Sequence, residues 1–194
     1  MKVIGINGSP RKGGNTDYIT KVVFEILENA GIKTEIVQIG GDIVKGCNGC
    51  RICFKKKDNR CVIDDDSLND LVLKLKACDG VLLASPTYFS DVTPEMKAFM
   101  DRAGFVSNAN GGFLIHKAGA AITAVRRGGA QHTLDTMNHW LHYQQTYMVG
   151  SSYWNMVICR EVGDAAKDEE GMLTMKKLGE NMVYLLEHLN TKTQ

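Results

Sequence analysis

The sequence predicts an α/β protein built on a doubly wound parallel sheet of five strands, with helices on both faces. Two observations favour this class. Apolar runs of strand length alternate along the chain with longer segments whose apolar residues recur at helical spacing. Two of these runs are also apolar on nearly every position, which is typical of central strands that are covered on both faces.

The first third of the chain predicts strand, helix, strand. Residues 2–7 form an apolar run with β-branched side chains. Apolar residues from Ile19 to Ala30 then recur at helical spacing until Gly31, which predicts the end of a helix. Residues 34–39 form the second predicted strand.

The middle of the chain continues the same alternation. Residues 68–75 predict a helix, and residues 80–84 predict a third strand that is buried on both faces. Thr93 and Pro94 have the residue types of an N-cap and a first helical position, so a further helix is expected to begin there.

The last third completes the predicted sheet. Residues 118–125 read as a buried fourth strand, 131–143 as a helix and 147–150 as a short fifth strand. Apolar residues at helical spacing over 175–189 predict a closing amphipathic helix.

One domain is expected, because 194 residues are enough for one well-buried core and few for two. We therefore treat residues 1–194 as a single domain. Residues 41–66 are its one irregular insertion, after the second strand. A connection of this length is usually either functional or disordered.

The charge balance excludes two classes of partner. With 23 basic and 22 acidic side chains the formal net charge is +1, so no basic field is available to hold nucleic acid or an anionic membrane. Residues 1–7 lack the apolar core and cleavage site of a signal peptide, and no apolar run reaches the roughly 20 residues of a membrane span. We expect a cytoplasmic protein, whose six cysteines suggest metal or redox chemistry before disulfides.

The loop between the first strand and the first helix, GSPRKGGNT at residues 8–16, predicts a phosphate site. Its glycines let backbone amides turn inward, Ser9 and Thr16 offer hydroxyls, and Arg11 offers a charged fork near a helix N-terminus. The loop has neither the ending of a triphosphatase loop nor the spacing of a dinucleotide site. A single terminal phosphate therefore fits better than a pyrophosphate; the alternative is an ordinary solvated turn.

Two further loops follow strands at the same predicted edge of the sheet. ASPTYFS at residues 84–90 combines a rigid turn with two adjacent aromatic residues, and its backbone could meet the edge of a flat heterocycle. Its rings could equally cap the core. AVRRGG at residues 124–129 places Arg126 and Arg127 beside glycines, with a binding role and a solvated turn as alternatives.

Four of the six cysteines lie in the segment CNGCRICFKKKDNRC, at Cys47, Cys50, Cys53 and Cys61. Two Cys-x-x-Cys steps bring three sulfurs around one centre, and the gap before Cys61 leaves room for the fourth, so the spacing predicts a [4Fe-4S] cluster. A structural zinc site, or cysteines without metal, are the alternatives. The remaining pair, Cys78 and Cys159, lie at or near strands and are expected to be packed thiols.

The motifs GSPRKGGNT, CNGCRICFKKKDNRC, SPTYFSDVTPEMKAFMDR and TAVRRGGA occur in this order. Together they resemble the iron-sulfur flavoprotein branch of the flavodoxin-like NADPH-dependent FMN reductase superfamily. The resemblance covers residues 1 to about 154. It implies the flavodoxin-like strand order 2-1-3-4-5. It also implies an FMN site formed by Ser9, Arg11, Gly14, Asn15 and Thr16 at the phosphate, Pro86, Thr87, Tyr88 and Phe89 at the isoalloxazine, and Arg126, Gly128 and Gly129 after the fourth strand.

The function that follows is an FMN-dependent oxidoreductase. Electrons would pass between NAD(P)H or ferredoxin and a quinone, dioxygen, peroxide or another acceptor, by way of the cluster. FMN carries the chemistry, so no side chain is nominated as catalytic. The alternatives are a plain NAD(P)H-dependent FMN reductase without a cluster and a non-catalytic flavin electron carrier.

The resemblance also implies a homo-oligomer, a dimer or tetramer with flavins near the subunit contacts. Large rings are unusually frequent late in the chain, and aromatic residues are enriched in interface cores. The expected contact residues are His139, Trp140, His142, Tyr143, Tyr147, Tyr153 and Trp154. Each ring could instead belong to the chain's own core or surface.

Overall fold

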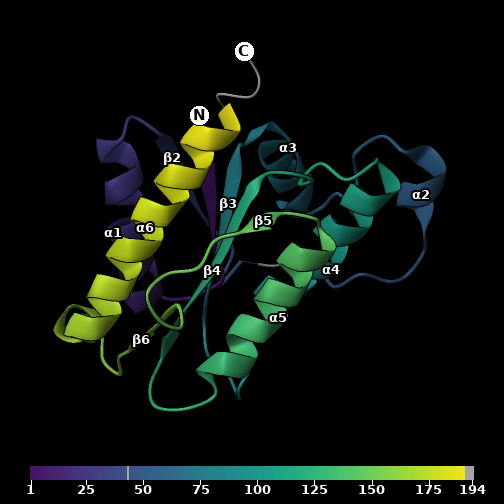
Figure 1. Cartoon of the computed structure of the whole chain (residues 1–194). Helices are drawn as coiled ribbons and strands as arrows, with labels where there is room; N and C mark the ends of the chain where they lie inside the picture. Colours follow the sequence, from purple (N-terminus) through teal and green to yellow (C-terminus); the bar gives the residue numbers. More distant parts are fainter. Residues whose placement is uncertain (43, 191–194) are drawn as a thin grey trace.

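The computed structural model describes residues 1–42 and 44–190, in which strands and helices alternate along the chain (Figure 1). The elements in chain order are β1 (Lys2–Asn7), α1 (Asn15–Asn29), β2 (Lys33–Gln38), α2 (Ile52–Lys56), α3 (Leu68–Ala77), β3 (Gly80–Pro86), α4 (Pro94–Ala109), β4 (Ala118–Val125), α5 (Ala130–Tyr143), β5 (Tyr147–Met148), β6 (Met156–Ile158), the 3-10 helix η1 (Asp164–Lys167) and α6 (Glu169–Asn190). Every predicted strand and helix has a counterpart among them.

The strands form one parallel sheet in the order β2-β1-β3-β4-β5, which confirms the predicted order. Asn7, the last residue of β1, pairs with Gln38 of β2 and with Ala84 of β3. This register aligns the carboxyl ends of the three strands. The loops that follow them therefore start from one edge of the sheet, where open parallel sheets bind ligands.

The fifth strand position is divided into two pieces, where the sequence predicted one strand at 147–150. β5 pairs with Ala118 and Gly119 near the start of β4, and β6 pairs with residues 123–125 at its end. Between them, the Ser151 hydroxyl donates to the Tyr153 carbonyl, 2.8 Å away, and lies 2.5 Å from the Asn155 side chain. Such local bonds compete with the strand ladder, which explains the interruption.

Successive side chains of the central strands point alternately into two hydrophobic cores, one on each face of the sheet. Ile4 and Ile6 face the core shared with α3, α4 and α5, whereas Val3 faces the core shared with α1 and α6. Figure 1 shows the same division, with α1 and α6 on one side of the sheet and α3, α4 and α5 on the other. This period of two is the strand signature on which the prediction depended.

Helix α4 begins where the sequence predicted. The Thr93 side chain accepts a hydrogen bond from the Met96 amide, 3.4 Å away, and Pro94 occupies the first helical position. The same hydroxyl donates to the Gly8 carbonyl over 2.9 Å. One buried side chain thus both caps α4 and fixes the start of the loop that follows β1.

The cysteine-rich insertion, predicted at 41–66, runs from β2 to α3 and contains α2; Ile43 lies outside the described residues. Its base is closed where the Lys45 amide donates to the Asp66 carboxylate over 3.0 Å. Its tip lies against α4, because the rings of Phe54 and Phe105 meet edge to face with centroids 6.1 Å apart. Figure 1 shows α2 at the right-hand margin, beyond α4.

In residues 1–42 and 44–190, no helix combines the length and apolar character that crossing a membrane requires.

Candidate functional site

A cavity of about 310 Å³ opens at the carboxyl edge of the sheet. This volume falls at the lower end of the range found for small-molecule sites, roughly 300–1,000 Å³. Its walls come from the loops after β1, β3, β4 and β6. The lining residues are Ser9, Arg11, Asn15, Thr16, Pro86, Thr87, Tyr88, Ala124, Arg126, Cys159, Arg160 and Glu161. Eight of the twelve residues predicted from the sequence for the cofactor are in this set.

The loop after β1 leaves the first amides of α1 without a side-chain cap. The N-cap of α1 is Gly14, which provides no hydroxyl or carboxylate for those amides. The first turn of a helix has N–H groups that need an acceptor, and its dipole favours an anion there. Ser9 is buried beside this turn and accepts a hydrogen bond from the Arg11 amide over 3.2 Å. An uncapped helix start with a buried hydroxyl and Arg11 at the cavity wall fits a phosphate group.

Asn15 lies at the cavity, but its side chain is engaged elsewhere. Its amide nitrogen donates to the Glu161 carbonyl at 2.8 Å. Its carbonyl oxygen accepts from the Gly163 amide at 3.0 Å and from the Ala165 amide at 3.4 Å. The side chain therefore fixes the loop after β6 as one wall of the cavity.

The loop after β3 is held firmly at its start and turns sharply at its end. The Thr87 hydroxyl lies 3.1 Å from the hydroxyls of both Thr123 and Thr133. Tyr88 and Asp91 then pair through two backbone hydrogen bonds around Phe89 and Ser90, which have positive φ angles of 48° and 64°. This is the geometry of a tight primed turn, which non-glycine residues adopt only under strain. Phe89, predicted to meet the cofactor, is fully exposed at the tip and outside the cavity lining.

The loop after β4 contributes Arg126 to the cavity, while the other two predicted residues lie outside the lining. Gly129 has a φ of 86° and packs against Ser90, whose Oγ would lie 2.6 Å from an added Cβ. Gly129 therefore joins this loop to the tight turn after β3. Gly128 is exposed.

Cys159, Arg160 and Glu161 form a wall of the cavity that was not predicted from the sequence. These residues follow β6, and a strand of three residues gives too short an apolar run to be recognised. Burial raises the pKa of the Cys159 thiol to about 11 and that of Cys78 to about 11. Both are buried, as predicted, and are protonated at neutral pH.

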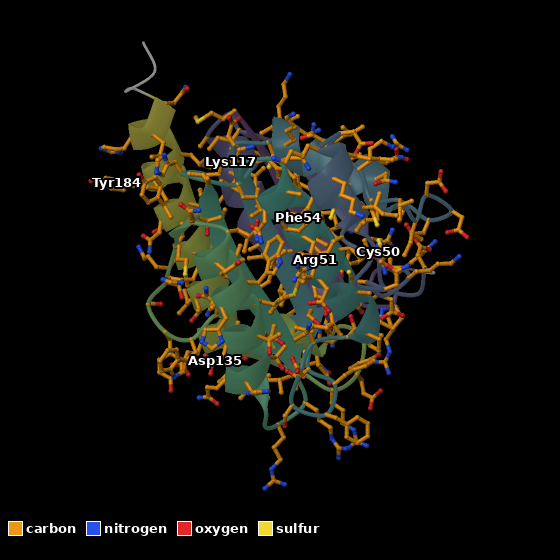
Figure 2. All side chains as sticks on the ribbon, turned by 90° about the vertical axis from the view of Figure 1, so that its right-hand side faces the viewer. Cys50, Arg51, Phe54, Lys117, Asp135 and Tyr184 are labelled. Atoms are coloured by element: carbon orange, nitrogen blue, oxygen red, sulfur yellow. The ribbon has the colours of Figure 1, made fainter. Side chains whose placement is uncertain are left out.

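The four clustered cysteines surround a second cavity, of about 240 Å³, between the insertion and α4. Cys47 and Cys50 are exposed, whereas Cys53 and Cys61 are half-buried, and all six cysteines of the chain are free thiols. The opposite wall consists of Arg102, Phe105 and Val106 of α4. Figure 2 looks onto this side of the molecule, with Cys50, Arg51 and Phe54 labelled.

The backbone around these cysteines is tightly folded. Arg51, Lys57 and Asn59 all have positive φ angles, of 55°, 52° and 60°. Each such non-glycine residue is unfavourable in isolation and is retained when its surroundings impose it, as is common at functional sites. Among the described residues, no group of three or more His, Cys, Asp and Glu could hold a single metal ion.

Cys61 is the most firmly held of the four. The buried Asn69 side chain accepts from the Cys61 amide at 2.7 Å and donates to the Cys61 carbonyl at 3.1 Å. Nε of Arg102 donates to the Cys61 sulfur at 3.4 Å. At the other end of the segment, the Gly49 amide donates to the Cys47 sulfur at 3.5 Å. Sulfurs that accept N–H hydrogen bonds are suited to carry the negative charge of metal-bound thiolates.

Comparison with known proteins identifies the family. A family model described as NADPH-dependent FMN reductase matches residues 1–159. The chain belongs to that family. Within it, the chain belongs with the iron-sulfur flavoproteins: it is 31% identical to the iron-sulfur flavoprotein of Methanosarcina thermophila over 96% of both chains. It is 32% identical to one from Methanocaldococcus jannaschii, over 94% of this chain and 95% of the relative.

The fold agrees with this family assignment. A solved flavodoxin from the domain Archaea superposes on 97% of this chain and 100% of its own with a TM-score of 0.63, at 16% identity. The chain is therefore a flavodoxin-like member of the NADPH-dependent FMN reductase family, and a flavin-dependent oxidoreductase. Ten of the twelve residues that line the carboxyl-edge cavity lie within the residues that the family model matches.

Arg102 lines the cysteine cavity and was not predicted from the sequence. It is 1% exposed and forms an ion pair with Asp66, and neither side chain is accessible to solvent. Burial opposes ionisation of Asp66, but hydrogen bonds from Arg102, the Lys45 amide and the Leu68 amide outweigh it and hold the pKa of the carboxyl below its ordinary value. The sequence gives no signal for this pairing, because the partners are 36 residues apart and meet only in the folded chain.

Proposed function

We propose that this protein is an FMN-dependent oxidoreductase that takes electrons from NAD(P)H or ferredoxin and passes them to a quinone, dioxygen, peroxide or another acceptor. We further propose that it does so with a [4Fe-4S] cluster held by Cys47, Cys50, Cys53 and Cys61. One observation carries the proposal: a chain of the FMN reductase family has four free cysteines lining a single cavity of about 240 Å³.

The carboxyl-edge cavity would hold FMN. The amides of the first turn of α1, with Ser9, Thr16 and Arg11, would bind the terminal phosphate, since they join an uncapped helix start to a hydroxyl and a guanidinium. Pro86, Thr87 and Tyr88 would border the ring. When bound, FMN supplies hydride transfer and the release of electrons singly or in pairs. The chain's residues would bind and orient it.

The cysteine cavity fits a cluster better than a single zinc ion. Zinc–thiolate bonds are about 2.3 Å long, so four thiolates on one zinc lie only about 3.8 Å apart. Four thiols around a cavity of about 240 Å³ leave room for a group of several atoms. When bound, a cluster stores single electrons, and hydrogen bonds to its sulfurs tune its potential.

Helix α4 connects the two proposed sites. Thr93, its N-cap, bonds to the loop after β1, and Arg102, nine residues further on, bonds to the cysteine segment. At 1.5 Å per residue the two contacts are about 13 Å apart along the helix. Gly40, the residue just before the insertion, also touches the loop after β1, since an added Cβ on Gly40 would overlap the backbone of Gly8 and Ser9.

Anaerobic reduction of the FMN-loaded protein tests the enzymatic part of the proposal. NADPH, NADH and chemically reduced ferredoxin are added separately, and flavin absorbance is followed. We expect at least one donor to bleach the flavin and a quinone or dioxygen to restore its colour. If dithionite reduces the flavin but none of the three donors does, the protein is an electron carrier and the proposed activity is wrong.

A further inference from the structure

Arg102 is a buried cationic side chain that contacts Cys61, one of the four sulfurs of the cysteine cavity. Lysines and arginines elsewhere in the insertion, including Arg51 and Arg60, are exposed, so solvent screens their charges. Arg102 differs from them because it is 1% exposed and rises from the third turn of α4 directly into the wall of the cavity.

The guanidinium of Arg102 uses all three of its nitrogens. Nε donates to the Cys61 sulfur at 3.4 Å. One terminal nitrogen donates to the Lys45 carbonyl at 3.1 Å and to the Asp66 carboxylate, and the other donates to the Ile63 carbonyl at 2.7 Å. The side chain therefore fixes both ends of the insertion while presenting one N–H to the sulfur.

The ion pair with Asp66 is oriented, so it does not cancel the effect of the guanidinium on the sulfur. Nε faces Cys61, whereas the carboxylate is bound at a terminal nitrogen, and Asp66 is not among the residues that line the cavity. The positive end of the pair is thus the end nearer the cavity. With both side chains inaccessible to solvent, the field of this pair is screened far less than that of an exposed charge.

We propose that Arg102 is a positioning residue that raises the reduction potential of the iron-sulfur cluster held by the four cysteines, by donating a hydrogen bond to the Cys61 sulfur and presenting the positive end of a buried ion pair to it. This inference rests on the proposed function. One-electron reduction of the cluster takes an electron from an external reductant and adds one negative charge. A hydrogen-bond donor and a nearby positive charge stabilise the reduced form more than the oxidised form.

The test compares the reconstituted parent protein with a variant that removes both members of the ion pair, Arg102→Met with Asp66→Asn. This double change leaves no buried unpaired charge. The single side-chain oxygen of Asn still accepts from one of the two amides, Lys45 or Leu68, that the two carboxylate oxygens of Asp66 serve in the parent. Iron and sulfide are measured first. The ratio of reduced to oxidised cluster is then read by electron paramagnetic resonance at a fixed potential, set by dithionite and mediators.

At equal iron content we expect the ratio to fall about tenfold in the double variant, which corresponds to about 59 mV for one electron. A ratio within threefold of the parent's overturns the proposal. Should the double variant not fold, Arg102→Lys is measured instead, with the same direction expected, because an ammonium cannot make all four contacts of the guanidinium. A ratio within threefold in that variant also overturns it.

Arg60→Met is the matched control, because Arg60 is an exposed arginine next to Cys61 in sequence. We expect its ratio to stay within threefold of the parent's, since solvent screens the charge that is lost. A tenfold fall there would mean that any nearby charge sets the potential, which overturns the specific role of Arg102. If the parent itself takes up less than one iron per chain, the proposed function fails, and this inference with it.

Discussion

Arg11 lies at the wall of the carboxyl-edge cavity, beside the uncapped start of α1. Hydrogen bonds to charged groups contribute about 1.5–3 kcal/mol each, so loss of the guanidinium from a phosphate contact weakens binding about ten- to a hundredfold. We expect Arg11→Ala to raise the dissociation constant of FMN by this factor, as measured by equilibrium dialysis. The free energy of unfolding should not change, because the side chain is exposed.

Lys12→Ala provides the control for this prediction. Lys12 is also exposed and lies next to Arg11 in the loop, but it is not part of the cavity lining. We expect it to bind FMN within about twofold of the parent, since solvent screens an exposed charge that makes no direct contact. Equal losses in the two variants, or none in Arg11→Ala, would show that Arg11 has no direct contact with the phosphate.

Gln144 is a buried residue whose replacement is expected to stabilise the protein. It is 3% exposed, and both polar atoms of its side-chain amide are buried without a hydrogen-bond partner among the described residues. A buried unpaired polar group costs about 1–3 kcal/mol. Gln144→Met, of similar size, should raise the free energy of unfolding by about 1 kcal/mol in urea titrations.

The exposed neighbour Gln145 serves as the control for that change, and Gln145→Met should leave the free energy of unfolding within about 0.5 kcal/mol of the parent. A loss of stability in Gln144→Met would indicate that the buried amide has a partner that methionine cannot replace.

Residue types and spacing indicate which side chains line the carboxyl-edge cavity, but they do not indicate which hydrogen-bond partners those side chains have. Arg11, Thr16 and Arg126, which are predicted to bind the cofactor, lie at the cavity. The hydrogen bonds of Asn15 to the loop after β6, and those of Arg102 to the insertion, join segments far apart in sequence. Such partners are set by tertiary packing, which a single sequence does not encode as a local pattern.

At the scale of elements, α3 controls the position of the fourth cysteine. Asn69, in the first turn of α3, makes hydrogen bonds with the Cys61 amide, the Cys61 carbonyl and the Ile63 carbonyl. We expect Asn69→Ala to lower the free energy of unfolding by about 2 kcal/mol, because it leaves these partly buried backbone groups unpaired. Reconstituted protein should also lose iron faster on desalting than the parent.

Asn108, exposed on α4, is the matched position for this test. Asn108→Ala should change stability by no more than about 0.5 kcal/mol and should retain iron as the parent does. If Asn69→Ala retained parental stability and iron, the position of Cys61 would not depend on α3.

Long periodic elements were predictable and short ones were not. The strands over 2–7 and 118–125 agree with the structure because each is buried in the sheet and reads as an apolar run. β6 has only three residues, and the segment 149–155 that separates it from β5 is held by local hydrogen bonds of Ser151. The loop after β6, one wall of the cavity, was missed for this reason.

For the whole molecule, we predict a homo-oligomer with contacts through the aromatic stretch, the ring-rich segment from His139 to Trp154. Two rings of that stretch are engaged within the chain. Nε1 of Trp140 donates to the Met100 carbonyl at 2.7 Å, and the Tyr147 ring stacks on His116 with centroids 5.6 Å apart. Tyr143, Tyr153 and Trp154 remain exposed by 67%, 56% and 55%, which leaves them free to contact another copy.

Light scattering of the flavin-loaded protein at micromolar concentration should give the mass of a dimer or tetramer. Replacing Tyr153 and Trp154 together by Ser should shift that mass toward the 21.4 kDa of one chain, since large rings dominate interface cores. Replacing the exposed Tyr184 of α6 by Ser, outside the aromatic stretch, should not. A parent protein with the mass of one chain would refute the prediction.

The cofactor content of the purified protein tests most directly whether one chain carries both FMN and a four-cysteine cluster. The protein is reconstituted anaerobically with iron, sulfide and FMN, desalted, and assayed for iron, sulfide, zinc and flavin beside Cys50→Ala. We expect about four irons and one flavin per chain in the parent, and loss of the cluster with retention of flavin in Cys50→Ala. Less than one iron per chain in the parent, or full iron in Cys50→Ala, would contradict it.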